Sequence, residues 1–284
     1  MGTLARVKSR AINKGTVALR EIGRKLFSFH LLSFSVLALL AVLIAQPLRS
    51  PARLFDDPDI WWHLANARNL FATHHFVVTE PYAFTVAGKR WIDPEWGAEV
   101  PFWMAYQLFR LRGIYFASWI LIVANLGLLY MRSLRKTVNP NAALWASVVA
   151  LGLMTVNAGP RTILCGYLCL SLLLWVIDEV GQGSLRWLPV VPILFLVWVN
   201  LHGSWIIGLA MLALYIICGF FNVQHGLINQ IRHEWKIQTA LLVTLALSCA
   251  SVFVNPYGWR LVWNPFDMML KQPLNIATIE EWKP

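Results

Sequence analysis

The sequence predicts an all-α fold, a polytopic transmembrane bundle of about seven helices. Hydrophobic residues make up 58% of the 284 residues and charged residues only 13%, about half of the roughly 25% that is usual in a soluble domain. The chain also holds 15 tryptophans, more than a core of this size needs. These observations exclude a disordered protein, a secreted disulfide scaffold and a typical soluble enzyme.

The first elements in chain order are a basic segment, a membrane span and a large polar loop. Residues 1–25 are predicted to be cytoplasmic, and the apolar run over 26–46 is predicted to be a first span that serves as an uncleaved signal anchor. A basic leader of this kind is also compatible with a mitochondrial transit peptide. A tryptophan-rich outer loop follows over 47–112 and is too acidic and too rich in Pro and Gly to cross the membrane.

Six more spans are expected within residues 113–254, and an outer tail over 255–284 closes the chain. The six apolar runs cover about 113–131, 141–158, 161–177, 187–201, 203–221 and 238–254. Basic residues in the loop after 113–131, namely Arg132, Arg135 and Lys136, place that loop in the cytoplasm by the positive-inside rule. The N-terminus is then cytoplasmic and the C-terminus outside. The same loops explain the net charge of +10, so nucleic acid is not an expected partner.

Two interfacial helices are predicted in the first outer loop, over about 58–73 and 97–111. The first helix begins within the run Asp57-Pro58-Asp59-Ile60-Trp61-Trp62-His63-Leu64. Asp57 suits the N-cap, and Asp59 and His63 are four residues apart and share one face. The residues expected to rest on the bilayer surface are Trp61, Trp62, Leu64 and Leu70. A cap needs one carboxylate, and clustered carboxylates repel one another, which predicts a functional role for Asp57 or Asp59.

Other polar side chains are expected on the same outer side. Asp93 and Glu95 form a second acidic motif before the second interfacial helix, and they are either a cap or part of a site. Arg161 and His202 lie at the outer ends of later spans, and Arg161 is able to bind a lipid phosphate or to snorkel to the interface. No nucleotide-binding or hydrolase motif is present, so any chemistry depends on carboxylates at a membrane face.

The order of these motifs resembles the GT-C superfamily of membrane glycosyltransferases, and more closely a group of bacterial family-39-like membrane proteins. The segments that carry the resemblance are Asp57–Leu64, Glu95-Trp96, Asn200-Leu201-His202-Gly203, Asn255-Pro256-Tyr257-Gly258 and Glu281-Trp282-Lys283-Pro284. The similarity extends over about residues 27–284. One departure is Ile60, which stands where many members of the superfamily have a glutamate.

The resemblance implies transfer of a sugar from a polyprenyl-phosphate donor to a glycan, lipid or protein acceptor. The reaction would take place at the outer face of the bacterial cytoplasmic (inner) membrane, with Asp59 or Asp57 as the base. It also implies a cation at the lipid phosphate, and a divalent ion, Mg or Mn, would have Asp57, Asp59 and Glu95 as candidate ligands. The implied substrate-binding residues are His63, Asp93, Glu95, Arg161 and His202.

Two alternatives remain open from the sequence. The chain ends soon after Glu281-Trp282, whereas the proteins that it resembles continue with further spans, which is compatible with a truncated or non-catalytic GT-C-like subunit. A lipid or polysaccharide transporter is the other alternative. Transporters usually carry charged residues or internal repeats within their spans, and neither is found here.

Overall fold

The chain is all-α, as predicted, in a computed structural model that describes residues 33, 36–37, 59–154, 160–225 and 228–271. The helices are α3 (Asp59–Thr73), α4 (Trp96–Phe109), α5 (Leu111–Thr137), α6 (Pro140–Met154), α7 (Ile163–Gly181), α8 (Val190–Leu201), α9 (Trp205–Cys218), α10 (Trp235–Ser251) and α11 (Trp259–Lys271). A 3-10 turn, η2 (Phe84–Val86), and a short antiparallel hairpin of β1 (Val223–His225) and β2 (Ile228–Gln230) complete the elements.

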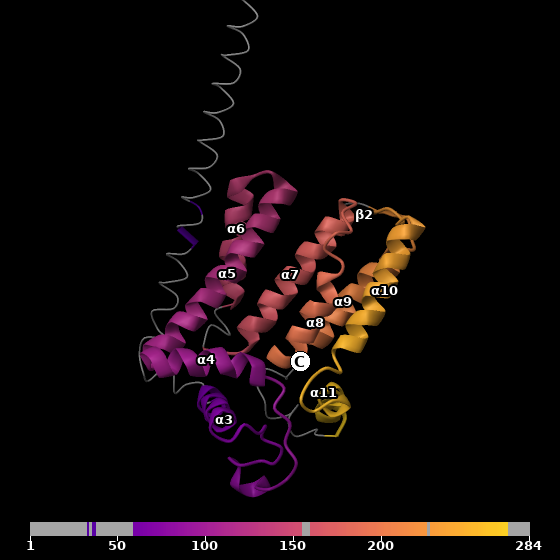
Figure 1. Ribbon diagram of the computed structural model, residues 1–284. Coiled ribbons are helices and arrows are strands. Elements are labelled where there is room, and N and C mark those ends of the chain that lie inside the picture. The colour runs from indigo at the N-terminus through magenta and orange to yellow at the C-terminus, as the bar shows by residue number, and fades with distance from the viewer. Residues whose placement is uncertain (1–32, 34–35, 38–58, 155–159, 226–227, 272–284) are drawn as a thin grey trace, which may run out of the picture.

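Among the described helices, α5 to α10 form the bundle, and α3, α4 and α11 lie at one end of it (Figure 1). α4 runs across the bundle axis beside the start of α5, and α3 and α11 lie beyond it on the same side (Figure 1). α3 packs on α4, and α4 packs on both α5 and α8. The end that carries α3, α4 and α11 is called the site end below.

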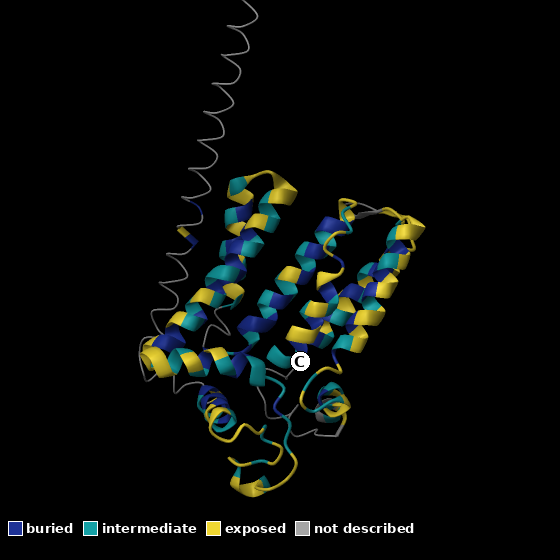
Figure 2. Cartoon of the chain, in the orientation of Figure 1, coloured by how far each residue is buried: buried dark blue, intermediate teal, exposed yellow. Residues whose placement is uncertain are grey.

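The bundle is held together by apolar packing on its inward faces. Phe195 and Trp198 of α8 are fully buried and stack with ring centroids 5.5 Å apart. Gly208 lets α9 approach these two rings closely, because a Cβ there would lie 2.4 Å from the Trp198 ring. Outward faces keep large exposed apolar side chains, such as Ile193, Ile207 and Val243 (Figure 2).

Two of the described helices are long and apolar enough to cross a membrane, α5 with 27 residues and α7 with 19. The other apolar bundle helices are shorter, with 15 residues in α6, 12 in α8, 14 in α9 and 17 in α10. The first predicted span lies almost wholly outside the described residues; within it, Leu37 contacts Tyr130 and Ala143.

The observed ends of the other helices differ modestly from the predicted ones. The helices predicted over 58–73 and 97–111 occupy Asp59–Thr73 and Trp96–Phe109. Part of the predicted tail is the helix α11, because Trp259 to Lys271 is strongly amphipathic. Leu64 does not lie at the surface as expected: it is 4% exposed and packs with Ile60, Phe102 and Ile114 between α3, α4 and α5.

Ion pairs join α5 to α7 at the end of the bundle away from α3. Arg132 pairs with Asp178, Lys136 Nζ lies 2.7 Å from Asp178 Oδ1, and Arg135 Nη1 lies 2.5 Å from Glu179 Oε1. These three basic residues of α5 thus share two carboxylates of α7, Asp178 and Glu179. This end is called the basic end below.

Candidate functional site

A group of polar side chains is enclosed at the site end, where α3, α4 and two interhelical turns meet. We call it the carboxylate–histidine cluster, and its members are His63, Asn66, Asp93, Glu95, Glu99, Thr162 and His202. These residues come from four separate stretches of sequence. Polar groups rarely gather in a buried position unless they satisfy one another or serve a reaction.

Helical spacing explains how α3 and α4 contribute to the cluster. His63 and Asn66 are three residues apart on α3, and Glu95 and Glu99 are four apart at the start of α4, so each pair shares one face. Asp93 orders the entry to α4, because its Oδ1 accepts the backbone N–H of Glu95 at 3.0 Å. Both helices therefore direct polar side chains toward the space between them.

Close contact between α4 and α8 brings His202 to the cluster. Trp96 Nε1 donates to Asn200 Oδ1 at 2.8 Å, and a Cβ on Gly97 would lie only 2.6 Å from the Asn200 carbonyl oxygen. Glycine at this position lets the two backbones approach. The turn after α8 then presents His202 to Glu95.

Glu95 is the centre of the cluster and contacts three of its members. Its Oε2 accepts a hydrogen bond from Thr162 Oγ1 and lies 3.5 Å from His63 Nε2, and its Oε1 lies 3.4 Å from His202 Nε2. The Glu95 side chain is 17% exposed, so it is enclosed but still reachable. Asp59, exposed at the start of α3, is near enough to act on it electrostatically.

The hydrogen-bond pattern assigns the histidine tautomers. His202 Nδ1 accepts the backbone N–H of Ser204 at 3.1 Å, so neutral His202 carries its hydrogen on Nε2, which faces Glu95. Glu99 Oε1 accepts from Asn66 Nδ2 at 3.2 Å and lies 2.8 Å from His63 Nδ1. His63 therefore donates from Nδ1, and its Nε2 turns a lone pair toward Glu95.

The interior of the cluster binds protons that an exposed carboxylate would release. Burial, reinforced by the Asp93 carboxylate, raises the pKa of Glu99 far above its ordinary value. Burial lowers the pKa of His63 to about 3, with a further contribution from His202. The contact between His63 and Glu99 is therefore a hydrogen bond between neutral groups and not an ion pair. Burial also lowers the pKa of His202 to about 4.

Glu95 differs from Glu99 because its pKa falls in the physiological range. Burial raises the pKa of Glu95 to about 7, the Thr162 hydrogen bond opposes the rise, and the nearby Asp93 and Asp59 carboxylates add to it. A carboxylate that titrates near neutral pH is suited to take up and release a proton during a reaction.

Five of the residues predicted from sequence lie at or beside the cluster. Glu95, His63, Asp93 and His202 belong to it, and Asp59 lies at its edge, where it accepts from Trp62 Nε1 at 3.2 Å. Arg161 directly precedes Thr162 in the turn before α7. Asp57 lies outside the described residues.

Of the three candidate metal ligands, only Asp59 and Glu95 lie in the described part of the chain. Nowhere in it is a group of three His, Cys, Asp or Glu side chains arranged to hold a metal ion.

The sequence did not single out three residues of the cluster, namely Asn66, Glu99 and Thr162. Glu99 lies within the interfacial helix predicted over 97–111, and it is only 1% exposed. Its spacing of four from Glu95 was a usable signal, and so was the spacing of three between His63 and Asn66. Nothing in the local sequence distinguishes Thr162 from an ordinary turn residue.

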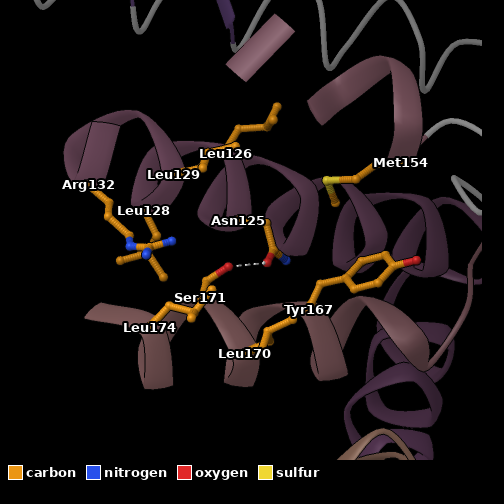
Figure 3. Close-up of a pocket in the computed structure, with 10 residues that line it drawn as sticks. All are labelled: Asn125, Leu126, Leu128, Leu129, Arg132, Met154, Tyr167, Leu170, Ser171 and Leu174. Carbon is orange, nitrogen blue, oxygen red and sulfur yellow. Dashed lines mark hydrogen bonds between the residues drawn. The ribbon is translucent and has the colours of Figure 1, made fainter. Parts of the chain in front are cut away.

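A separate cavity of about 180 Å³ lies between α5, α6 and α7 and is lined mainly by apolar side chains. Figure 3 shows Asn125 of α5 turned toward Ser171 of α7, with Ser171 Oγ 3.4 Å from Asn125 Oδ1. Its one charged lining residue, Arg132, is paired with Asp178. The cavity therefore offers no acid–base pair comparable with Glu95 and its neighbours.

Comparison with known protein families, with curated proteins and with solved structures finds no match to this chain.

Proposed function

We propose that the chain is an integral membrane protein in which the first apolar run and α5 to α10 cross the bilayer, with the site end outside. The apolar composition supports this proposal, as do the length of α5 and α7 and the large apolar side chains on the outward faces of the bundle. Arg132, Arg135 and Lys136 lie together at the basic end, which the positive-inside rule assigns to the cytoplasm. The bacterial cytoplasmic membrane is the proposed location.

At the site end, the proposed activity is transfer of a sugar from a polyprenyl-phosphate donor to an acceptor hydroxyl. The single observation that carries the proposal is Glu95, a reachable carboxylate held by Thr162 between two histidines. The resemblance of the sequence motifs to GT-C enzymes supplies the class of donor. The acceptor is a glycan, a lipid or a protein.

In the proposed reaction, the acceptor oxygen attacks the anomeric carbon of the sugar and the bond from that carbon to the phosphate oxygen breaks. The electron pair of the broken bond stays on the lipid phosphate, and the acceptor proton passes to Glu95. Help of this kind from a general base contributes about 10²- to 10⁴-fold to a rate. The structure favours Glu95 over Asp59 as the base, because Glu95 has the raised pKa and the fixed position.

The remaining polar residues have proposed supporting roles. Asp59, exposed at the start of α3, orients the acceptor, and His63 and His202 hold Glu95 in position from either side. Arg161 supplies positive charge for the phosphate leaving group. Mg or Mn at that phosphate remains a further proposal that chelation with EDTA tests, and no step above depends on it.

The test is sugar transfer from radiolabelled polyprenyl-phosphate sugars by membranes that contain the wild type or Glu95→Gln. We expect Glu95→Gln to lower the rate at least 100-fold at pH 7.5 while the protein level stays equal. Asp59→Asn is expected to lower it less, since Asp59 orients and does not accept the proton.

Glu234→Gln is the matched control, because Glu234 is an exposed glutamate at the basic end. It should keep the wild-type rate. Wild-type transfer that survives Glu95→Gln refutes the assignment of the base. No transfer from any donor by stably inserted protein refutes the enzyme and favours a non-catalytic subunit.

A further inference from the structure

The helix α11 places an apolar stripe on the outside of the molecule. Trp259, Trp263, Phe266 and Leu270 follow one another at intervals of four, three and four residues, so they lie along one face. Their exposed fractions are 64%, 51%, 40% and 77%. Soluble surfaces seldom hold four adjacent large apolar side chains without a partner.

The face of α11 opposite the stripe contacts the bundle through Leu261. Leu261 is 1% exposed and belongs to the same core as Val252 and Trp198. The turn before the helix is also tied, because Asn255 Nδ2 donates to the carbonyls of Val252 and Gly258 at 2.9 and 3.1 Å. The start of α11 is therefore joined to the bundle on the side away from the stripe.

The position of α11 indicates which partner covers the stripe. α11 begins eight residues after α10 ends and lies across the bundle axis at the site end (Figure 1). A helix that follows a span and lies across its axis runs along the membrane surface. Two tryptophans on the exposed face suit the boundary between headgroups and acyl chains, where amphipathic aromatic rings concentrate.

The exposed apolar surface also continues from α11 onto the bundle. Phe253 and Val254, in the turn between α10 and α11, are 52% and 58% exposed, and Leu247 of α10 is 53% exposed. Beside the stripe, Arg260 is exposed as well, and its charge suits a layer of lipid phosphates. A lipid phase that contacts both helices accounts for the exposure of these apolar side chains.

We propose that α11 is a membrane-surface helix whose stripe of Trp259, Trp263, Phe266 and Leu270 inserts into the headgroup–acyl boundary of the bilayer that the bundle spans. This inference rests on the proposed membrane location. The turn before α11 connects this helix to the site. It carries Tyr257, whose hydroxyl donates to the Val77 carbonyl at 2.9 Å. Tyr257 also contacts Phe76, which packs on Trp96 beside Glu95.

The experiment uses the full chain in nanodiscs of phosphatidylcholine and phosphatidylglycerol, with one cysteine labelled by an environment-sensitive fluorophore. Cys218 and Cys249 are exposed and are first replaced by serine. The labelled positions are Trp263→Cys on the stripe, Arg260→Cys beside it and Ile207→Cys on the bundle, where Ile207 is 57% exposed. Each is quenched by doxyl-labelled lipid and, separately, by aqueous iodide.

We expect lipid quenching several-fold above iodide quenching at positions 263 and 207, and the reverse at 260. Iodide quenching at 263 together with lipid quenching at 207 overturns the role of α11 and leaves the membrane bundle intact. Protection of 263 from both quenchers also overturns it, since another protein surface would then cover the stripe. Iodide quenching at 207 overturns the membrane location itself.

Discussion

Replacing Glu95 with glutamine is expected to change how the stability of the protein depends on pH. Burial raises the pKa of Glu95 from 4.5 to about 7, so the folded protein holds a proton that the unfolded chain releases above pH 4.5. Stability then falls as pH rises from 4.5 to 7. At about 1.4 kcal/mol for each pKa unit, ionisation of Glu95 costs about 3 kcal/mol above pH 7. Glutamine resembles the protonated acid and avoids this cost.

The assay is the thermal unfolding of purified wild type and Glu95→Gln, followed by tryptophan fluorescence between pH 5 and 8.5. The Tm of Glu95→Gln minus that of the wild type should increase across this range by on the order of 6 °C. Taking the difference cancels the opposite contribution of His63, whose lowered pKa makes folding less favourable as pH falls below 6.5. A difference that stays constant with pH refutes the buried, proton-binding state of Glu95, and Glu234→Gln should show no such trend.

Three further outcomes are expected. Gly97→Ala should lower Tm by several degrees and reduce transfer, because its Cβ would lie 2.6 Å from the Asn200 carbonyl oxygen. Gly152→Ala is the control and should lower neither, because a Cβ at position 152 would meet no neighbouring atom within 4 Å. Asp178→Asn should destabilise the protein by about 1–3 kcal/mol in thermal unfolding, since it leaves Arg132 without a charged partner. An unchanged Tm would contradict a stabilising role of the ion pairs between α5 and α7. The transfer rate should rise with pH through about 7 as Glu95 loses its proton, and a rate that falls over that interval contradicts its role as a base.

The helices of this protein were predictable because their signals are local. Apolar runs separated by basic or glycine-containing turns predicted α5 to α10, and Pro58 with its flanking aspartates predicted the start of α3 near Asp59. Leu64 was placed wrongly because the composition of a helix does not reveal what covers it. α11 was not predicted, because its single amphipathic stretch lies inside the segment that was predicted only as an outer tail.

The site was only partly predictable, for a related reason. Its acidic motifs stand out in the sequence because carboxylates are rare in this apolar chain. Their partners depend on which turns the fold brings together, and no local pattern links Thr162 to Glu95, 67 positions away. The raised pKa of Glu95 is likewise a property of burial, which only the three-dimensional arrangement specifies.

The bond between Trp96 and Asn200 joins residues that are 104 positions apart, and this separation has a consequence for synthesis. When α4 has just been synthesised, α5 to α8 have still to be made. Glu95 therefore has neither Thr162 nor His202 as a partner at that stage. The cluster cannot be complete before the turn after α8, which carries His202, has been synthesised. The cluster therefore forms late, and its formation requires the preceding helices to be in place already.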